Sequence, residues 1–115
     1  MNIETFRAYC LAKLGVTESF PFDEVTLVFK VGGKIFALTS LDQVVLEINL
    51  KCNPERAQQL RETYDAVRPG YHMNKKHWNT ITVDGSVKNA ELLTWIDHSY
   101  ELVVQSLPRK LRAEL

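Results

Sequence analysis

The residues best suited to binding chemistry lie in one segment, residues 66–83, which contains no Asp or Glu. Positive side chains there alternate with aromatic rings and amides, a combination that suits a polyanion with stackable bases. Lys and Arg would neutralise phosphates, amides and imidazoles would position them, and exposed rings would stack on bases. The candidate nucleic-acid-binding residues are Arg68, Tyr71, His72, Asn74, Lys75, Lys76, His77, Trp78 and Asn79.

Catalytic chemistry has less support in the sequence. No nucleophile elbow, Walker loop, dinucleotide-binding fingerprint or HExxH motif is present. We therefore expect no enzymatic activity, no metal and no cofactor. The competing interpretation, an enzyme or metal protein, depends on the groups that titrate or attack near neutral pH. These groups are Cys52, His72, His77, Asp97 and His98.

The composition favours one soluble domain. The chain has 115 residues, of which 45% are hydrophobic and 24% charged, with 14 basic and 14 acidic side chains. A chain of this length buries enough apolar surface to fold without disulfides or metal ions, so we expect a single domain over residues 1–115. The sequence has no secretion signal and no apolar run of about 18 residues, which predicts a cytoplasmic protein with no membrane contact.

Capping residues and apolar spacing predict three helices. Asn2 would cap a first helix whose apolar stripe extends to Leu14 and which ends by Gly15. Asn53 followed by Pro54 is a strong start for a second helix. Asn89 is the expected cap of a long last helix that Pro108 ends or bends.

The remaining runs predict antiparallel strands. Residues 25–31 and 34–38 flank Gly32 and Gly33, which predicts a tight hairpin because such turns need positive φ. Residues 44–50 alternate apolar and polar side chains, and residues 78–83 form another β-prone run. The order of elements predicts an α+β protein, a two-layer α/β sandwich in which helices cover one face of an antiparallel sheet.

Charge is unevenly distributed along the chain. Residues 51–79 carry six basic and three acidic side chains, whereas residues 1–50 carry four and six. Lys30 or Lys34 of the hairpin would flank the positive segment. The basic residues at 109, 110 and 112 would either extend a phosphate-binding surface or only stabilise the end of the last helix.

Short motifs in a fixed order relate most of the chain to a known family. They are PFD (21–23), KVGGKIFAL (30–38), LKCNP (50–54), PGYHMNKKHWNT (69–80), WIDHSY (95–100) and LPRKLR (107–112). With these motifs the chain resembles the MmcQ/YjbR family. The resemblance implies a small bacterial cytoplasmic protein with a frataxin-like (CyaY-like) α/β sandwich, and DNA binding as its activity.

One difference from the wider frataxin-like group concerns iron. Iron-handling members have an acidic first helix, whereas the first helix here has Glu4 beside Arg7 and Lys13. Binding a hard cation needs several convergent carboxylates. We therefore do not expect iron binding.

These observations predict a monomeric protein that binds DNA phosphates through the cationic loop after the second helix. The alternative is a protein-interaction or chaperone-like module in which the same loop binds an acidic protein partner. Exposure of Trp78 would support base stacking, and burial would remove it from the site.

Overall fold

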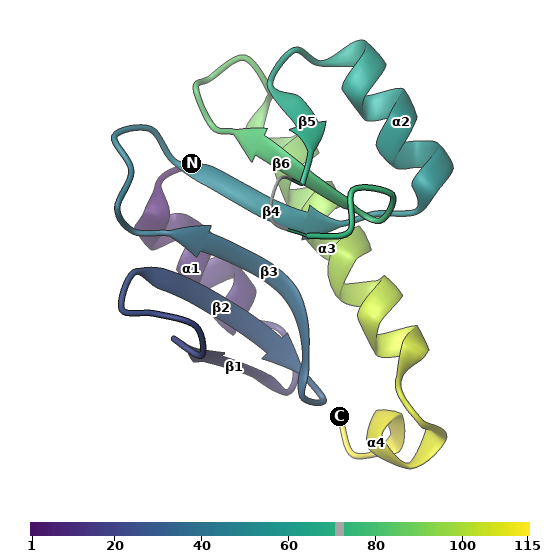
Figure 1. The fold of residues 1–115 in the computed structure, drawn as a ribbon. Helices are drawn as coiled ribbons and strands as arrows, with labels where there is room; N and C mark the ends of the chain where they lie inside the picture. The colour runs from purple at the N-terminus through teal and green to yellow at the C-terminus, as the bar shows by residue number, and fades with distance from the viewer. Residues whose placement is uncertain (71–72) are drawn as a thin grey trace.

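The computed structural model describes residues 1–70 and 73–115, and its centre is one antiparallel sheet with helices on one face (Figure 1). The strands lie in the order β1-β2-β3-β4-β6-β5. The strands are β1 (Val16–Ser19), β2 (Thr26–Val31), β3 (Lys34–Ser40), β4 (Glu47–Lys51), β5 (Val67–Pro69) and β6 (Trp78–Thr82). The helices are α1 (Ile3–Leu11), α2 (Pro54–Thr63), α3 (Asn89–Ser106) and α4 (Arg109–Ala113). The predicted α+β sandwich is confirmed.

The first two helices begin where capping chemistry predicts. The side chain of Asn2 accepts a hydrogen bond from the backbone N–H of Thr5 at 2.9 Å, and the Thr5 hydroxyl accepts one from Asn2 N–H at 2.9 Å. Asn53 accepts from the N–H groups of Glu55 and Arg56 at the start of α2. Both caps satisfy amides that have no partner inside the helix.

The expected cap of α3 is wrong. Lys88 occupies the capping position and makes no side-chain cap, while Asn89 is already the first helical residue. The Asn89 side chain instead accepts a hydrogen bond from the amino terminus of Met1 at 3.0 Å. The stripe of α1 also ends earlier than expected, because the helix stops at Leu11 and Leu14 is 70% exposed.

The β2–β3 hairpin is confirmed, since Gly32 and Gly33 both have positive φ, at +58° and +80°. The strand expected over residues 44–50 begins only at Glu47, and Val44, which was expected to face the core, is fully exposed. Residues 16–19 and 67–69 form the two edge strands, which the sequence analysis did not predict. Both are short, and β5 contains Pro69, a residue that edge strands tolerate.

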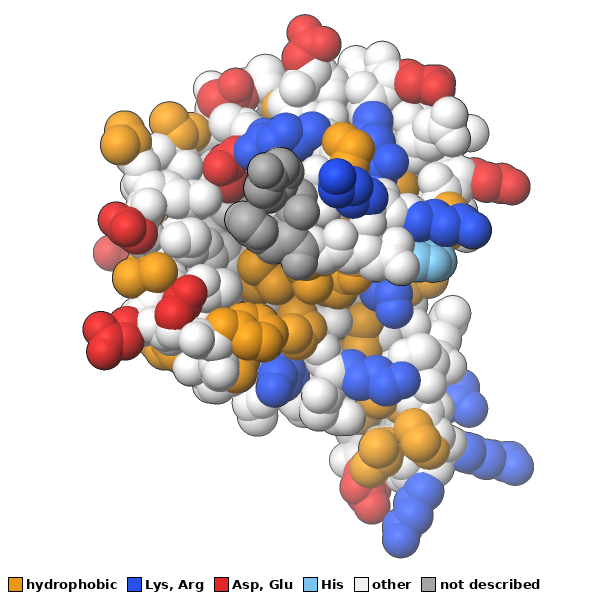
Figure 2. Space-filling model, in the orientation of Figure 1, with side chains coloured by type: hydrophobic (Ala, Val, Ile, Leu, Met, Phe, Trp, Pro, Cys, Tyr) orange, Lys and Arg blue, Asp and Glu red, His pale blue; other side chains and the backbone are white. Residues whose placement is uncertain are grey.

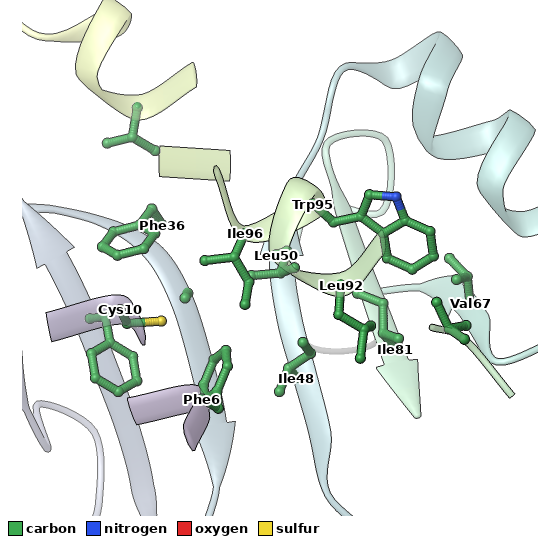
Figure 3. Close-up of a cluster of buried hydrophobic side chains, with 14 of the residues drawn as sticks. Phe6, Cys10, Phe36, Ile48, Leu50, Val67, Ile81, Leu92, Trp95 and Ile96 are labelled. Atoms are coloured by element: carbon green, nitrogen blue, oxygen red, sulfur yellow. The ribbon is translucent and has the colours of Figure 1, made fainter. Parts of the chain in front are cut away.

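The hydrophobic core lies between the sheet and the helices (Figure 3). Phe6 of α1 packs edge-on against Phe29 of β2, with ring centroids 5.6 Å apart. Trp95 of α3 packs in the same manner against Tyr64, at 5.1 Å. Burying these rings stabilises the attachment of the helices to one face only.

A buried hydroxyl fixes α3 against the central strands. Ser99 is fully buried, donates to the carbonyl of Phe36 at 2.5 Å and accepts from the N–H of Lys51 at 2.9 Å. The ends of β3 and β4 therefore have a defined position beside the C-terminal half of α3.

Within the described residues, no helix is both long enough and apolar enough to cross a membrane.

Candidate nucleic-acid interface

The described part of the loop before β6 is a compact turn held by Asn74. The Asn74 carbonyl accepts hydrogen bonds from the N–H groups of His77 and Trp78 at 3.1 and 3.0 Å. Its side-chain oxygen accepts from the N–H of Lys76 at 2.9 Å. The turn leaves Lys75 and Lys76 exposed, as expected for phosphate contact, and His77 half-buried.

Arg61 of α2 anchors this loop from behind. Its Nε donates to the side-chain oxygen of Asn79 at 2.6 Å, and its Nη2 donates to the carbonyls of Trp78, at 3.2 Å, and Lys75. Asn79 in turn donates to the carbonyl of Ala57 at 3.4 Å. All these acceptors are neutral, so the guanidinium charge of Arg61 is not cancelled by them.

Two of the expected contact residues are not available to a ligand. Trp78 is 8% exposed and Asn79 is 2% exposed, so the expected stacking and positioning roles of these two residues are wrong. Asn79 is covered by α2, to which its side chain is hydrogen-bonded, and the backbone of Gly70 lies close against the side chain of Trp78. The side chain of Asn79 faces the helices and accepts a hydrogen bond from Arg61. Tyr71 and His72 lie outside the described residues.

The guanidinium of Arg68 contacts neighbouring side chains of the sheet. It pairs with the carboxylate of Glu47 and donates to the hydroxyl of Thr82 at 2.7 Å. A neighbouring carboxylate offsets part of the attraction of an arginine for a phosphate. The expected contact of Arg68 with phosphate stays a prediction.

The antiparallel order brings positive side chains from distant segments to one end of the sheet. At that end β2 and β4 finish, β3 and β6 begin, and α3 leads into α4. Figure 2 shows Lys and Arg side chains along the right and lower right of the open face. We call this surface the basic end, and its residues are Lys30, Lys34, Lys51, Lys75, Lys76, Arg109, Lys110 and Arg112.

Carboxylates also occur at this end, at Glu55 in the first turn of α2 and Glu114 after α4, but ion pairs are few there in the described residues. Apart from Lys75, no residue of the basic end forms an ion pair with an Asp or Glu of the described chain. Lys34 reaches only the carbonyl and hydroxyl oxygens of Ser106, both at 3.5 Å. The hairpin and α4, whose position the sequence left open, thus belong to the same positive surface as the loop.

The opposite end of the sheet is acidic. There β2 and β4 begin, β3 and β6 finish, and the connecting loops carry carboxylates (Figure 2, left). We call this surface the acidic end, and its residues are Asp23, Glu24, Asp42, Glu47 and Asp84. The near-zero net charge of the chain therefore conceals a separation of charge across the sheet.

The open face of the sheet contains a hollow that sequence reasoning missed. Its volume is about 890 Å³, and its lining includes Phe22, Leu38, Asn49, Arg68, Met73 and Thr80. Four of these, Leu38, Asn49, Thr80 and Arg68, are successive partners across β3, β4, β6 and β5. No local motif could have shown this row, because each strand contributes one residue.

Of the groups considered for catalysis, the structure describes Cys52, His77, Asp97 and His98, and each has a structural contact. Asp97 accepts from Tyr9 and Lys13, whereas the ring of His98 accepts from the N–H of Asn53 at 3.2 Å. Burial raises the pKa of the Cys52 thiol, which keeps it protonated and a poor nucleophile. No cluster of three or more His, Cys, Asp or Glu side chains fit to hold a metal occurs in residues 1–70 and 73–115.

Comparison with known proteins gives consistent matches. The family model described as YjbR matches residues 11–102. Uncharacterized protein YjbR of Escherichia coli K12 is 35% identical over 112 residues, which are 97% of this chain and 95% of that protein. Uncharacterized protein YbdF of Escherichia coli O157:H7 is 38% identical over 107 residues, covering 93% of this chain and 88% of that protein.

Solved structures extend the match to the fold. The crystal structure of Deinococcus radiodurans protein DR2400 superposes with a TM-score of 0.93 at 39% identity, covering 98% of this chain and 86% of that one. A crystal structure from Pseudomonas syringae superposes with a TM-score of 0.77 at 29% identity, covering 90% of this chain and 99% of that one. The sheet and its helices are therefore common to this chain and both structures.

Proposed function

The chain belongs to the YjbR family, and we propose that it binds DNA by placing the phosphates on the basic end of its sheet. The observation that carries the proposal is the gathering of lysines and arginines from four separate segments at one end of the sheet. A backbone of regularly spaced negative charges is the ligand for which such an extended positive surface is suited.

The proposed contacts differ from those expected from the sequence. Lys75 and Lys76 remain at the centre, with Asn74 and His77 beside them as positioning donors. Lys51, the hairpin lysines and the cations of α4 extend the surface. The expected contacts of Tyr71 and His72 stay predictions.

Binding to phosphates alone would be independent of base sequence and sensitive to salt. An acidic protein would be attracted by the same cations, and it is the alternative ligand. A role without catalysis, a monomeric state, a cytoplasmic location and a frataxin-like (CyaY-like) relationship of the fold are parts of the same proposal that stay predictions.

The test changes the loop and measures the salt dependence of DNA binding. Replacing Lys75 and Lys76 together by Ala should lower the affinity for DNA of every sequence. It should also flatten the slope of log K against log salt by about 1.8, because each lost phosphate contact contributes about 0.9. The titration would run from about 50 to about 200 mM salt.

Lys88→Ala is the matched control, since Lys88 is exposed but lies after β6 on the side of the acidic end. Its slope should equal that of the parent. An unchanged slope in the Lys75/Lys76 variant would remove the loop from the interface. Absence of binding in dilute buffer, together with saturable binding of an acidic protein, would replace DNA by the alternative ligand.

A further inference from the structure

The hollow on the open face has the size and lining of a site for a small organic group. At about 890 Å³ it lies within the range of ligand pockets. Leu38 and Met73 give it apolar surface, and Phe22, 67% exposed, stands at its margin. Figure 2 shows hydrophobic side chains at the centre of this face, between the basic and the acidic ends.

The charge of the hollow argues against a phosphate as its occupant. Asp23, Asp42 and Glu47 line it, and among the described lining residues the one Lys or Arg is Arg68, which pairs with Glu47. An anion would therefore meet net negative charge there. A neutral group with apolar faces and polar edges fits better, because the lining offers both apolar contacts and hydrogen bonds.

Two polar side chains are held in place for such a group. The hydroxyl of Thr80 donates to the side-chain oxygen of Asn49 at 2.6 Å, which orients the Asn49 amide. Among the described residues the amide nitrogen of Asn49 has no acceptor, so it can donate to a ligand. Glu47 and Thr82 hold the guanidinium of Arg68, whose plane can stack on an aromatic ring.

The hollow is next to the basic end on the same face. Lys51 lies two residues beyond Asn49 on β4, so both side chains point to the open face, about 7 Å apart along the strand. That spacing matches the reach from a base to its own phosphate. A nucleotide with its base over Asn49 would place its phosphate near Lys51.

We propose that the hollow binds a base of single-stranded nucleic acid, while the phosphates of the same strand lie on the basic end. This inference depends on the proposed function and specifies its ligand. Bases in a duplex are paired and stacked inside the helix, so only a single strand can place one in the hollow. Stacking and a single amide contact favour a base over a bare phosphate chain without selecting strongly among bases.

The test compares two probes with the same number of phosphates. One is an oligothymidylate of about 12 nucleotides, and the other is an abasic deoxyribose phosphate of equal length. The oligothymidylate should bind about 10-fold more tightly, because a stacked base contributes about 1–3 kcal/mol. Equal affinities would overturn the inference and leave phosphate binding intact.

The Phe22→Ala variant distinguishes binding of the base from binding of the phosphates. Because Phe22 is mostly exposed, the variant should fold and should lose about fivefold or more in affinity for the oligothymidylate. Its affinity for the abasic probe should not change. Phe20→Ala is the matched control, since Phe20 is also exposed but does not line the hollow, and it should bind both probes like the parent.

The two proposals fail in different ways. The Lys75→Ala/Lys76→Ala variant should weaken both probes equally, since it removes only phosphate contacts. Failure of both probes to bind the parent in dilute buffer would overturn the proposed function and this inference together. An equal loss of both probes in Phe22→Ala would overturn only the assignment of the base to the hollow.

Discussion

The two ends of the sheet each contain an arginine that fixes the neighbourhood of β6, but their partners differ. At the basic end Arg61 donates to one amide oxygen and two backbone carbonyls. At the acidic end Arg68 pairs with the carboxylate of Glu47. Only the second arrangement cancels charge, so Arg61 adds to the positive potential around the loop while Arg68 does not add to that of its own end.

The number of cations in a segment therefore does not determine the electrostatic potential around it. Arg61, Arg68, Lys75 and Lys76 lie within one stretch of the chain. Their contribution to binding depends on whether the fold supplies a carboxylate partner, as Glu47 does for Arg68. The position of each cation relative to the sheet is therefore the variable to test.

The largest effect is expected at Arg61. Arg61→Ala should reduce the free energy of unfolding by about 2–4 kcal/mol, because it removes the Arg61 donors to the buried Asn79 side chain and to two backbone carbonyls. Urea denaturation measures this. Arg56→Ala on the same helix is the control and should cost less than about 1 kcal/mol, since no side-chain hydrogen bond of Arg56 stands in the described contacts. Equal losses would show that Arg61 is an ordinary surface residue.

An intermediate effect is expected in α4. Lys110→Gln and Arg112→Gln should each lower the slope of log K against log salt for DNA by about 0.9 if α4 contacts the phosphates with the rest of the basic end. Glu114→Gln, which changes charge in the opposite sense beside α4, should not lower the slope. If Lys110→Gln and Arg112→Gln both keep the slope of the parent, the interface is restricted to the loop and the strand ends.

The smallest effect concerns pH. Burial, and to a lesser degree Arg56, lowers the pKa of His98, whose neutral ring accepts from the N–H that precedes α2. The unfolded chain then binds more protons than the folded one, so stability should fall slightly as the pH drops from above about 6.5 through the lowered pKa. Urea denaturation at several pH values measures the change. His98→Gln should flatten it, and an undiminished pH dependence in that variant would assign it to another group.

Local chemistry explains the parts of the fold that the sequence predicted correctly. Asn2 and Asn53 cap helices by bonds to amides two or three residues away, and Gly32 with Gly33 makes its turn by backbone freedom alone. Asn89 is the first helical residue and not the cap, and its side chain accepts from the distant amino terminus, a contact that its sequence neighbours do not indicate. The edge strands were missed because their pairing partners, rather than their own patterns, define them.

The candidate site was predictable only in part. The acid-free segment correctly indicated Lys75 and Lys76 as exposed cations. Trp78 and Asn79 belong to the same segment but are buried, because Gly70 lies close against Trp78 and helix α2 covers Asn79. The row of residues across the hollow takes one residue from each of four strands, so no single run of sequence could reveal it.

The order of residues by itself determined where helices start, where the chain turns and which segment is rich in positive charge, since these depend on neighbours a few positions apart. The tertiary structure alone decided which cations are neutralised, which aromatic rings are covered and which strand ends lie together. Those outcomes follow from antiparallel pairing, which brings residues tens of positions apart to one end of the sheet and sets the sign of the charge there.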